Sequence, residues 1–138
     1  MLLEFKTKNY KSFVEEASFS MVAAPKQKGL DYSLMKTKIK GKEIKGLSSS
    51  VIYGPNAAGK TNIIGAMDVL RAIVLRGNIR NSEEKSSPNP AAAALELIPN
   101  NNEMESKPVC FEIEFYEEDG EDHKFKIHYE LEVDLGIF

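Results

Sequence analysis

The sequence predicts an α/β (α+β) fold in which a mixed β-sheet with antiparallel hairpins packs around one main helix. Two patterns carry this prediction. Apolar and polar residues alternate through residues 108–134, which is typical of strands buried on one face. Between about residues 59 and 76, apolar residues instead recur at spacings of three and four, which indicates a helix with a wide apolar face. A chain of 138 residues accommodates both patterns in one domain, 1–138.

Composition describes an ordinary globular chain. Hydrophobic residues make up 42% and charged residues 28%, and the net charge of −3 gives no general indication of nucleic-acid or membrane binding. The N-terminus lacks a signal-peptide pattern, and no run approaches the ~18 apolar residues of a membrane span. We therefore expect a cytoplasmic protein without a membrane partner.

Cysteine and histidine are too few for a recognisable metal motif. The single cysteine, Cys110, cannot form an internal disulfide. A zinc site built on the two histidines, His123 and His128, would need carboxylates to complete it. Two polar positions on a strand are the simpler interpretation.

Strands are expected in the N-terminal third. Residues 2–9 alternate between apolar and polar side chains, and residues 16–23 form a second strand-like run. Residues 34–47 predict a hairpin that turns at Lys40-Gly41. Its lysine-rich face could meet nucleic-acid phosphates, although a solvated strand face is the commoner explanation. The lysines concerned are Lys36, Lys38, Lys40, Lys42 and Lys45.

The predicted helix runs from about Gly59 to Arg76, and Gly77 provides a stop signal. Its apolar face should belong to the core and consists of Ile63, Ile64, Met67, Leu70, Ile73 and Val74. Residues 78–90 are polar, contain two prolines and predict a flexible loop. Residues 91–98 are ambiguous between a short helix and a strand.

The hairpin of residues 108–134 also has a predicted register. Its two apolar sets share a face only if paired residue numbers sum to an even value, which excludes a two-residue turn at Asp119-Gly120. A three-residue loop with Gly120 in the left-handed conformation meets this condition. It would place two glutamates opposite two lysines: Glu114 opposite Lys124, and Glu112 opposite Lys126.

The strongest motif is a Walker A loop at residues 54–61, which fit the pattern G-x-x-x-x-G-K-[ST]. Residues 50–53 before it predict a strand, so the loop should join a strand to a helix and wrap its backbone N–H groups around a phosphate. Lys60 would reach the β and γ phosphates, and the hydroxyl of Thr61 would bind Mg²⁺. The loop residues expected to bind the nucleotide are Gly54, Pro55, Asn56, Ala57, Ala58, Gly59, Lys60 and Thr61.

Hydrolysis requires more than a phosphate loop. It needs an aspartate that organises Mg²⁺, usually at the end of a continuously apolar strand, and a residue that positions the attacking water. Asp134 follows an alternating strand buried on one side only, which disfavours it for the first role. We therefore assign no catalytic residue and leave open whether the chain is an enzyme, with no turnover expected from it alone.

Two segments give the chain a resemblance to a known family. Residues 9–13 (Asn-Tyr-Lys-Ser-Phe), followed by residues 51–62 around the Walker A loop, resemble the start of ABC-like AAA ATPases related to RecF, the structural maintenance of chromosomes proteins and the OLD nucleases. The resemblance implies the N-terminal lobe of a P-loop NTPase that binds ATP and Mg²⁺. It implies that Lys11 and Ser12 contact the nucleotide and that Asn56 lies beside the γ phosphate. Asn62 after the threonine is typical of the RecF-like branch.

The later motifs of that family do not follow in the chain. A complete member has a Q-loop glutamine, a signature motif, a Walker B Asp-Glu pair and a switch histidine, whereas the one glutamine here, Gln27, precedes the loop. The chain therefore resembles the N-terminal part of a longer ATPase. Its partners would be the rest of the domain and a second copy in a homodimer that sandwiches ATP.

Relatives couple this closure to DNA or to phage-defence effectors, but the acidic balance of the chain does not support DNA binding. Two other functions stay open. One is a non-catalytic module that binds a nucleotide or recruits a partner through the hairpin edge. The other is a stand-alone P-loop kinase or GTPase, for which lid and base-recognition residues are lacking.

Overall fold

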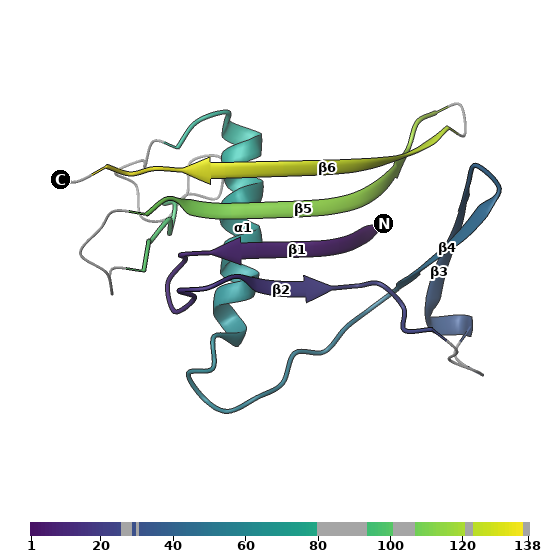
Figure 1. The fold of residues 1–138 in the computed structure, drawn as a ribbon, viewed down its shortest axis with the longest axis horizontal. Helices are drawn as coiled ribbons and strands as arrows, with labels where there is room; N and C mark the ends of the chain where they lie inside the picture. The colour runs from purple at the N-terminus through teal and green to yellow at the C-terminus, as the bar shows by residue number, and fades with distance from the viewer. Residues whose placement is uncertain (26–28, 30, 80–93, 101–106, 121–122, 137–138) are drawn as a thin grey trace.

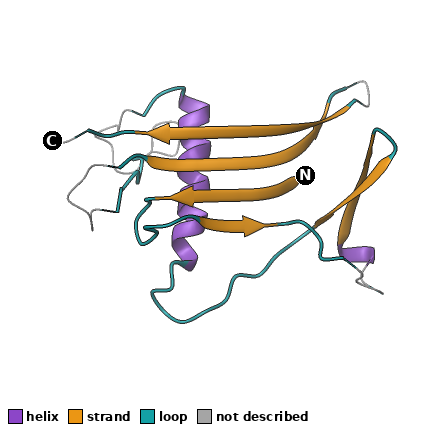
Figure 2. Ribbon diagram, in the orientation of Figure 1, coloured by secondary structure: helices purple, strands orange, loops and turns teal. Residues whose placement is uncertain are grey.

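The computed structural model describes residues 1–25, 29, 31–79, 94–100, 107–120 and 123–136. The main body has two layers, because one long helix crosses behind a four-stranded antiparallel sheet (Figures 1 and 2). The sheet has the order β2-β1-β5-β6, and its strands are β1 (Leu2–Lys8), β2 (Ala17–Ser20), β5 (Val109–Glu118) and β6 (Lys124–Val133). The helix is α1 (Lys60–Arg76). The predicted α/β class, with antiparallel hairpins around one main helix, is confirmed and is consistent with the N-terminal lobe of a P-loop NTPase.

A separate hairpin lies beyond one end of the sheet (Figure 1). It consists of β3 (Leu34–Ile39) and β4 (Lys42–Leu47), and the short 3₁₀ helix η1 (Asp31–Ser33) precedes it. The predicted turn is confirmed, since Lys40 and Gly41 connect the strands with φ values of 48° and 79°. Two of its lysines have acidic partners: Lys36 lies 2.7 Å from Asp31, and Lys45 lies 3.2 Å from Glu43.

Alternation along the strands gives the sheet two chemically different faces. Odd-numbered residues of β1, β5 and β6 face α1, and even-numbered residues face away from it. The buried core between the layers combines Phe5, Tyr10, Val109, Phe111 and Val133 with Ile63, Ala66, Val69, Leu70 and Ile73 of the helix. The outer face carries mostly glutamate and lysine side chains.

The register of the β5–β6 hairpin differs from the predicted one. Glu114 lies opposite His128 instead of Lys124, a shift of four residues. The observed register pairs all of β5 with all of β6, so each inward apolar residue faces a residue of the other strand. Since β5 ends at Glu118 and β6 begins at Lys124, more than three residues separate the strands, and Gly120 does not adopt the predicted left-handed conformation. The paired residue numbers still sum to an even value, as predicted, and both apolar sets therefore share the face toward α1.

The predicted ion pairs change with the register. Lys124 lies 3.4 Å from Glu118, directly opposite. Lys126 lies 2.8 Å from Glu114, but along the diagonal. The position opposite Glu112, which the sequence assigned to Lys126, is occupied by Glu130.

Helix α1 is buried over a narrower face than predicted. Ile64 and Val74 were expected in the core, yet each is 55% exposed. The sheet covers only one side of the helix, and the additional buried positions are Ala66 and Val69. The predicted end is confirmed: Gly77 adopts a left-handed conformation, and its N–H donates to the carbonyl of Ile73.

The strand predicted immediately before the Walker A loop is wrong. Residues 50–53 have no regular structure, and Val51 and Tyr53 are 83% and 90% exposed. A strand requires a neighbouring strand to pair its backbone groups, and in the described ranges no strand lies alongside this segment.

Other boundaries agree to within a few residues. The strand predicted at 2–9 is β1, and the run at 16–23 contains the shorter β2. Most of the predicted loop 78–90, like residues 91–93, lies outside the described residues. Residues 94–98 form neither a helix nor a strand. Among the described helices, none is both long and apolar enough to cross a membrane.

Candidate phosphate-binding site

The glycine-rich loop leads directly into the N-terminus of α1. Gly59 caps the helix without a side-chain hydrogen bond, and the first helical bonds run from the N–H groups of Asn62 and Ile63 to its carbonyl. In the described part of the chain, the N–H groups of Lys60 and Thr61 are therefore unpaired donors. An anion placed here would meet these donors at the positive end of the helix dipole.

The backbone of the loop is shaped like an anion-binding nest. Ala57 and Gly59 have φ values of 63° and 82°, and Ala58 between them is not in the left-handed region. Alternation of hand turns successive N–H groups toward the same concave side. A positive φ at an alanine is uncommon and costs roughly 1–3 kcal/mol, which is typical of functional loops.

The side chain of Lys60 lies over this loop. Its Nζ donates hydrogen bonds to the carbonyls of Gly54 at 2.8 Å and Pro55 at 2.6 Å. These carbonyls are neutral acceptors, so phosphate oxygens can replace them with stronger, charge-assisted hydrogen bonds. Thr61 is exposed one residue further along, at the start of the helix.

The N-terminal motif supports the loop through Ser12 and Phe13. Asn62 Nδ2 donates a hydrogen bond of 2.7 Å to Ser12 Oγ. A Cβ atom at Gly59 would lie 2.9 Å from the Phe13 ring and 3.1 Å from Ser12 Oγ. The structure thus brings Ser12 and Asn62 to the glycine-rich loop, and it leaves room only for glycine at position 59.

Lys11 lies elsewhere. Its Nζ pairs with a carboxylate oxygen of Glu96 and lies 5.5 Å from the centroid of the Tyr10 ring. It lies near Gly65, in the second turn of α1, where an added Cβ would be 3.9 Å from Nζ. The hydrogen bond to Glu96 raises the pKa of Lys11, so this cation persists at neutral pH. The structure does not bring it together with Lys60 and Thr61.

The turn that carries Lys11 is held by a distant segment. The backbone N–H of Lys11 donates to the carbonyl of Ile98 at 2.9 Å, and the carbonyl of Lys11 accepts from Asn100 Nδ2 at 2.6 Å. The sequence did not predict that Glu96, Asn100 and Phe13 support this site. Glu96 and Asn100 follow Lys11 by more than 80 residues, and no local pattern signals such contacts.

Tyr10 offers a test of this packing. It is fully buried, and its hydroxyl has no hydrogen-bond partner among the described residues. Burial raises the pKa of Tyr10. A buried hydroxyl without a partner costs about 1–3 kcal/mol. We expect Tyr10→Phe to raise the free energy of unfolding by about 1 kcal/mol in urea denaturation, and a loss of stability would show that the hydroxyl is bonded.

Comparison with known proteins adds one finding. Residues 49–135 match the family model described as "AAA domain, putative AbiEii toxin, Type IV TA system". This segment contains the glycine-rich loop, α1 and the β5–β6 hairpin and covers more than half of the chain. Neither curated proteins nor solved structures gave a match.

Proposed function

The chain belongs to the AbiEii toxin-like AAA-domain family, and from this premise we propose that its Walker A loop binds ATP with Mg²⁺. Membership supports a nucleotide-binding function of the ATPase type. The observation that carries the specific proposal is the start of α1, where unpaired N–H groups of Lys60 and Thr61 adjoin the ammonium group of Lys60. The N-terminal end of the helix and the Lys60 ammonium group both place positive charge there, which suits a polyphosphate.

Each residue of the loop has a distinct task in this proposal. The N–H groups of Gly59, Lys60 and Thr61 hold the β phosphate, and Lys60 Nζ exchanges the carbonyls of Gly54 and Pro55 for phosphate oxygens. The hydroxyl of Thr61 is the protein ligand of Mg²⁺, which neutralises charge on the phosphates when bound. Asn56 lies on the exposed side of the loop, available to the γ phosphate.

The N-terminal motif would assist from two positions. Ser12 and Asn62 fix the first turn of α1 against the loop through their 2.7 Å hydrogen bond. Lys11 would reach the nucleotide only after leaving Glu96, with which it is paired. We therefore assign Ser12 a positioning role and Lys11 a contact that forms on nucleotide binding.

We propose that the complete ATPase is of the ABC-like type related to RecF and includes further strands, helices and a second copy. Two exposed apolar surfaces support this. One is the segment Val51–Tyr53. The other is an apolar groove of about 440 Å³ between α1 and the inner face of the sheet, lined by side chains that include Met67, Val74, Phe115, Ile127 and Tyr129. Coupling to DNA or to phage-defence effectors would belong to that assembly.

The same groove favours the alternative function, a partner-binding module without catalysis. Its lining is almost wholly apolar, and Tyr129 at its edge is 39% exposed. Apolar patches of this kind mark contact surfaces in soluble proteins. The two functions differ in one measurable property, which is nucleotide binding by the loop.

Calorimetric titration of the chain with Mg·ATP tests the proposal. We expect a single site, and we expect Lys60→Ala to weaken it by about 10–100-fold, because a charged hydrogen-bonding group contributes roughly 1.5–3 kcal/mol. Lys42→Ala is the matched control, since Lys42 is exposed at the start of β4. Turnover measured in the same samples should be absent.

Three results would contradict the proposal. They are no binding by the unmodified chain, equal affinity after Lys60→Ala, and an equal loss after Lys42→Ala. Circular dichroism of each variant would verify that its fold is intact. Absence of binding in a folded protein would favour the partner-binding module.

A further inference from the structure

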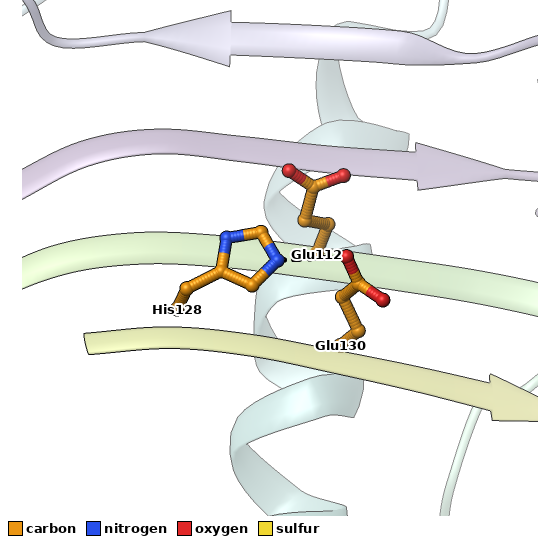
Figure 3. Close-up of side chains that lie close together, drawn as sticks. All are labelled: Glu112, His128 and Glu130. Carbon is orange, nitrogen blue, oxygen red and sulfur yellow. Dashed lines mark hydrogen bonds and ion pairs between the residues drawn. The ribbon is translucent and has the colours of Figure 1, made fainter.

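The outer face of the sheet places two carboxylates directly against each other. Glu112 of β5 lies opposite Glu130 of β6, and both point away from α1 (Figure 3). Like charges in this position destabilise an antiparallel pair. Lys6 partly offsets the charge on Glu112, with its Nζ 3.0 Å from Oε1. Glu130 is paired instead with a histidine.

That histidine, His128, lies between two carboxylates. Its Nδ1 is 3.1 Å from Glu114 Oε1, and its Nε2 is 2.7 Å from Glu130 Oε1. A neutral imidazole has one N–H donor and one lone pair, so it can donate to only one of them. If Nδ1–H donates to Glu114, the lone pair of Nε2 faces the Glu130 oxygen, and this contact becomes favourable when either a proton or a metal ion is bound at Nε2.

The positions of the three groups suit a metal ion. One ligand atom each from Glu112, His128 and Glu130 lie within 4.8 Å of one another, and Figure 3 shows the three side chains converging from adjacent strands. Rotation of exposed side chains can bring these atoms to the ~2.0–2.2 Å bonds of zinc with imidazole and carboxylate ligands. Glu114 contacts the other ring nitrogen, Nδ1, and a carboxylate in this position orients the imidazole of a metal-binding histidine.

We propose that Glu112, His128 and Glu130 form a Zn²⁺ site on the outer face of the sheet. The metal ion takes the place of the proton that Nε2 would otherwise need for a favourable contact with Glu130. Its positive charge also offsets the repulsion between the carboxylates of Glu112 and Glu130. Imidazole with carboxylates suits zinc better than Mg²⁺ or Ca²⁺, which prefer all-oxygen ligands. Three protein ligands leave a fourth position for water.

The observed strand register is what creates this site. In the predicted register Lys126 lay opposite Glu112 and neutralised it, whereas in the structure Glu130 takes that place. The need for carboxylates to complete a zinc site on a histidine was apparent from the sequence, but no pattern in it selected Glu112 and Glu130. The site lies on the face of the sheet away from α1, so it is separate from the Walker A loop.

Titration of the nucleotide-free 138-residue chain with Zn²⁺ alone tests the proposal. We expect one ion per chain and at least tenfold weaker binding by His128→Asn and by Glu130→Gln. His123→Asn is a matched control, because His123 lies in the loop beside Asp119 and not in the cluster. Glu132→Gln is a second, since Glu132 is the next outward glutamate of β6. Both controls should bind as the unmodified chain does.

A second measurement does not depend on the variants folding. Zn²⁺ added to the unmodified chain should shift the imidazole NMR signals of His128 and leave those of His123 unchanged. The proposal is overturned if the chain binds no Zn²⁺, if His128→Asn binds it as tightly as the unmodified chain, or if the signals of His123 shift instead.

Discussion

Replacing Phe111 by alanine is expected to lower the free energy of unfolding by about 3–5 kcal/mol. Phe111 is 1% exposed and lies near the start of β5, on the face toward α1. Its ring packs against that of Tyr10, with centroids 5.9 Å apart and planes at 60°. The substitution therefore loses buried apolar area and leaves a cavity beneath the turn that supports the Walker A loop.

Urea denaturation followed by circular dichroism measures this loss. Phe125→Ala is the matched control, because Phe125 lies on the same face of the hairpin but is 43% exposed. It should cost less than about 1.5 kcal/mol, since much of its surface is already in water. Equal losses at the two positions would mean that the core does not centre on Phe111. If Phe111→Ala does not fold, Phe111→Leu provides a milder version of the same comparison.

The second large effect is expected at Gly59. Alanine there would have to adopt a φ of 82°, at a cost of roughly 1–2 kcal/mol. Its Cβ would also lie 2.9 Å from the Phe13 ring, so the ring or the loop must move, which adds about 1–3 kcal/mol. We expect Gly59→Ala to reduce stability by about 2–5 kcal/mol in total and to weaken the proposed Mg·ATP binding together with it.

Substitution of Gly77 distinguishes the conformational cost of a positive φ from the cost of the contact with Phe13. Gly77 ends the same helix with a φ of 66°, but a Cβ there would meet no atom within 4 Å. Gly77→Ala should therefore cost only the conformational part, about 1–2 kcal/mol, and leave nucleotide affinity unchanged. A Gly59→Ala protein no less stable than Gly77→Ala would show that Phe13 does not restrict the loop.

Local patterns in the sequence predicted most of the elements. The spacing of apolar residues located α1, and Gly77 marked its end, because both signals lie within the helix itself. The rule that paired residue numbers sum to an even value predicted that the apolar residues of both hairpin strands lie on one face. It could not choose among the even registers, since that choice depends on pairing along the whole strand and on the length of the loop after Glu118.

The candidate site likewise has one part that the sequence predicted and another that it did not. Residues 54–61 are contiguous, so their motif was visible in the sequence, as were Ser12 and Asn62 through the family resemblance. The contact of Phe13 with Gly59 and the pairing of Lys11 with Glu96 were not visible, because each joins segments that are distant in the chain. The expected strand at 50–53 failed because a strand depends on a neighbour as well as on its own composition.

The position of β1 between β2 and β5 has a consequence for synthesis of the protein. Lys6 of β1 and its partner Glu112 of β5 are 106 residues apart, so β1 must wait for β5 to be synthesised before the two strands can pair. At roughly 5–20 residues per second, β1 spends about 5–20 s without its central partner. During that time Phe5 is uncovered, and the apolar side of α1 joins it once the helix has been synthesised, so the nascent chain exposes aggregation-prone surface until the sheet closes.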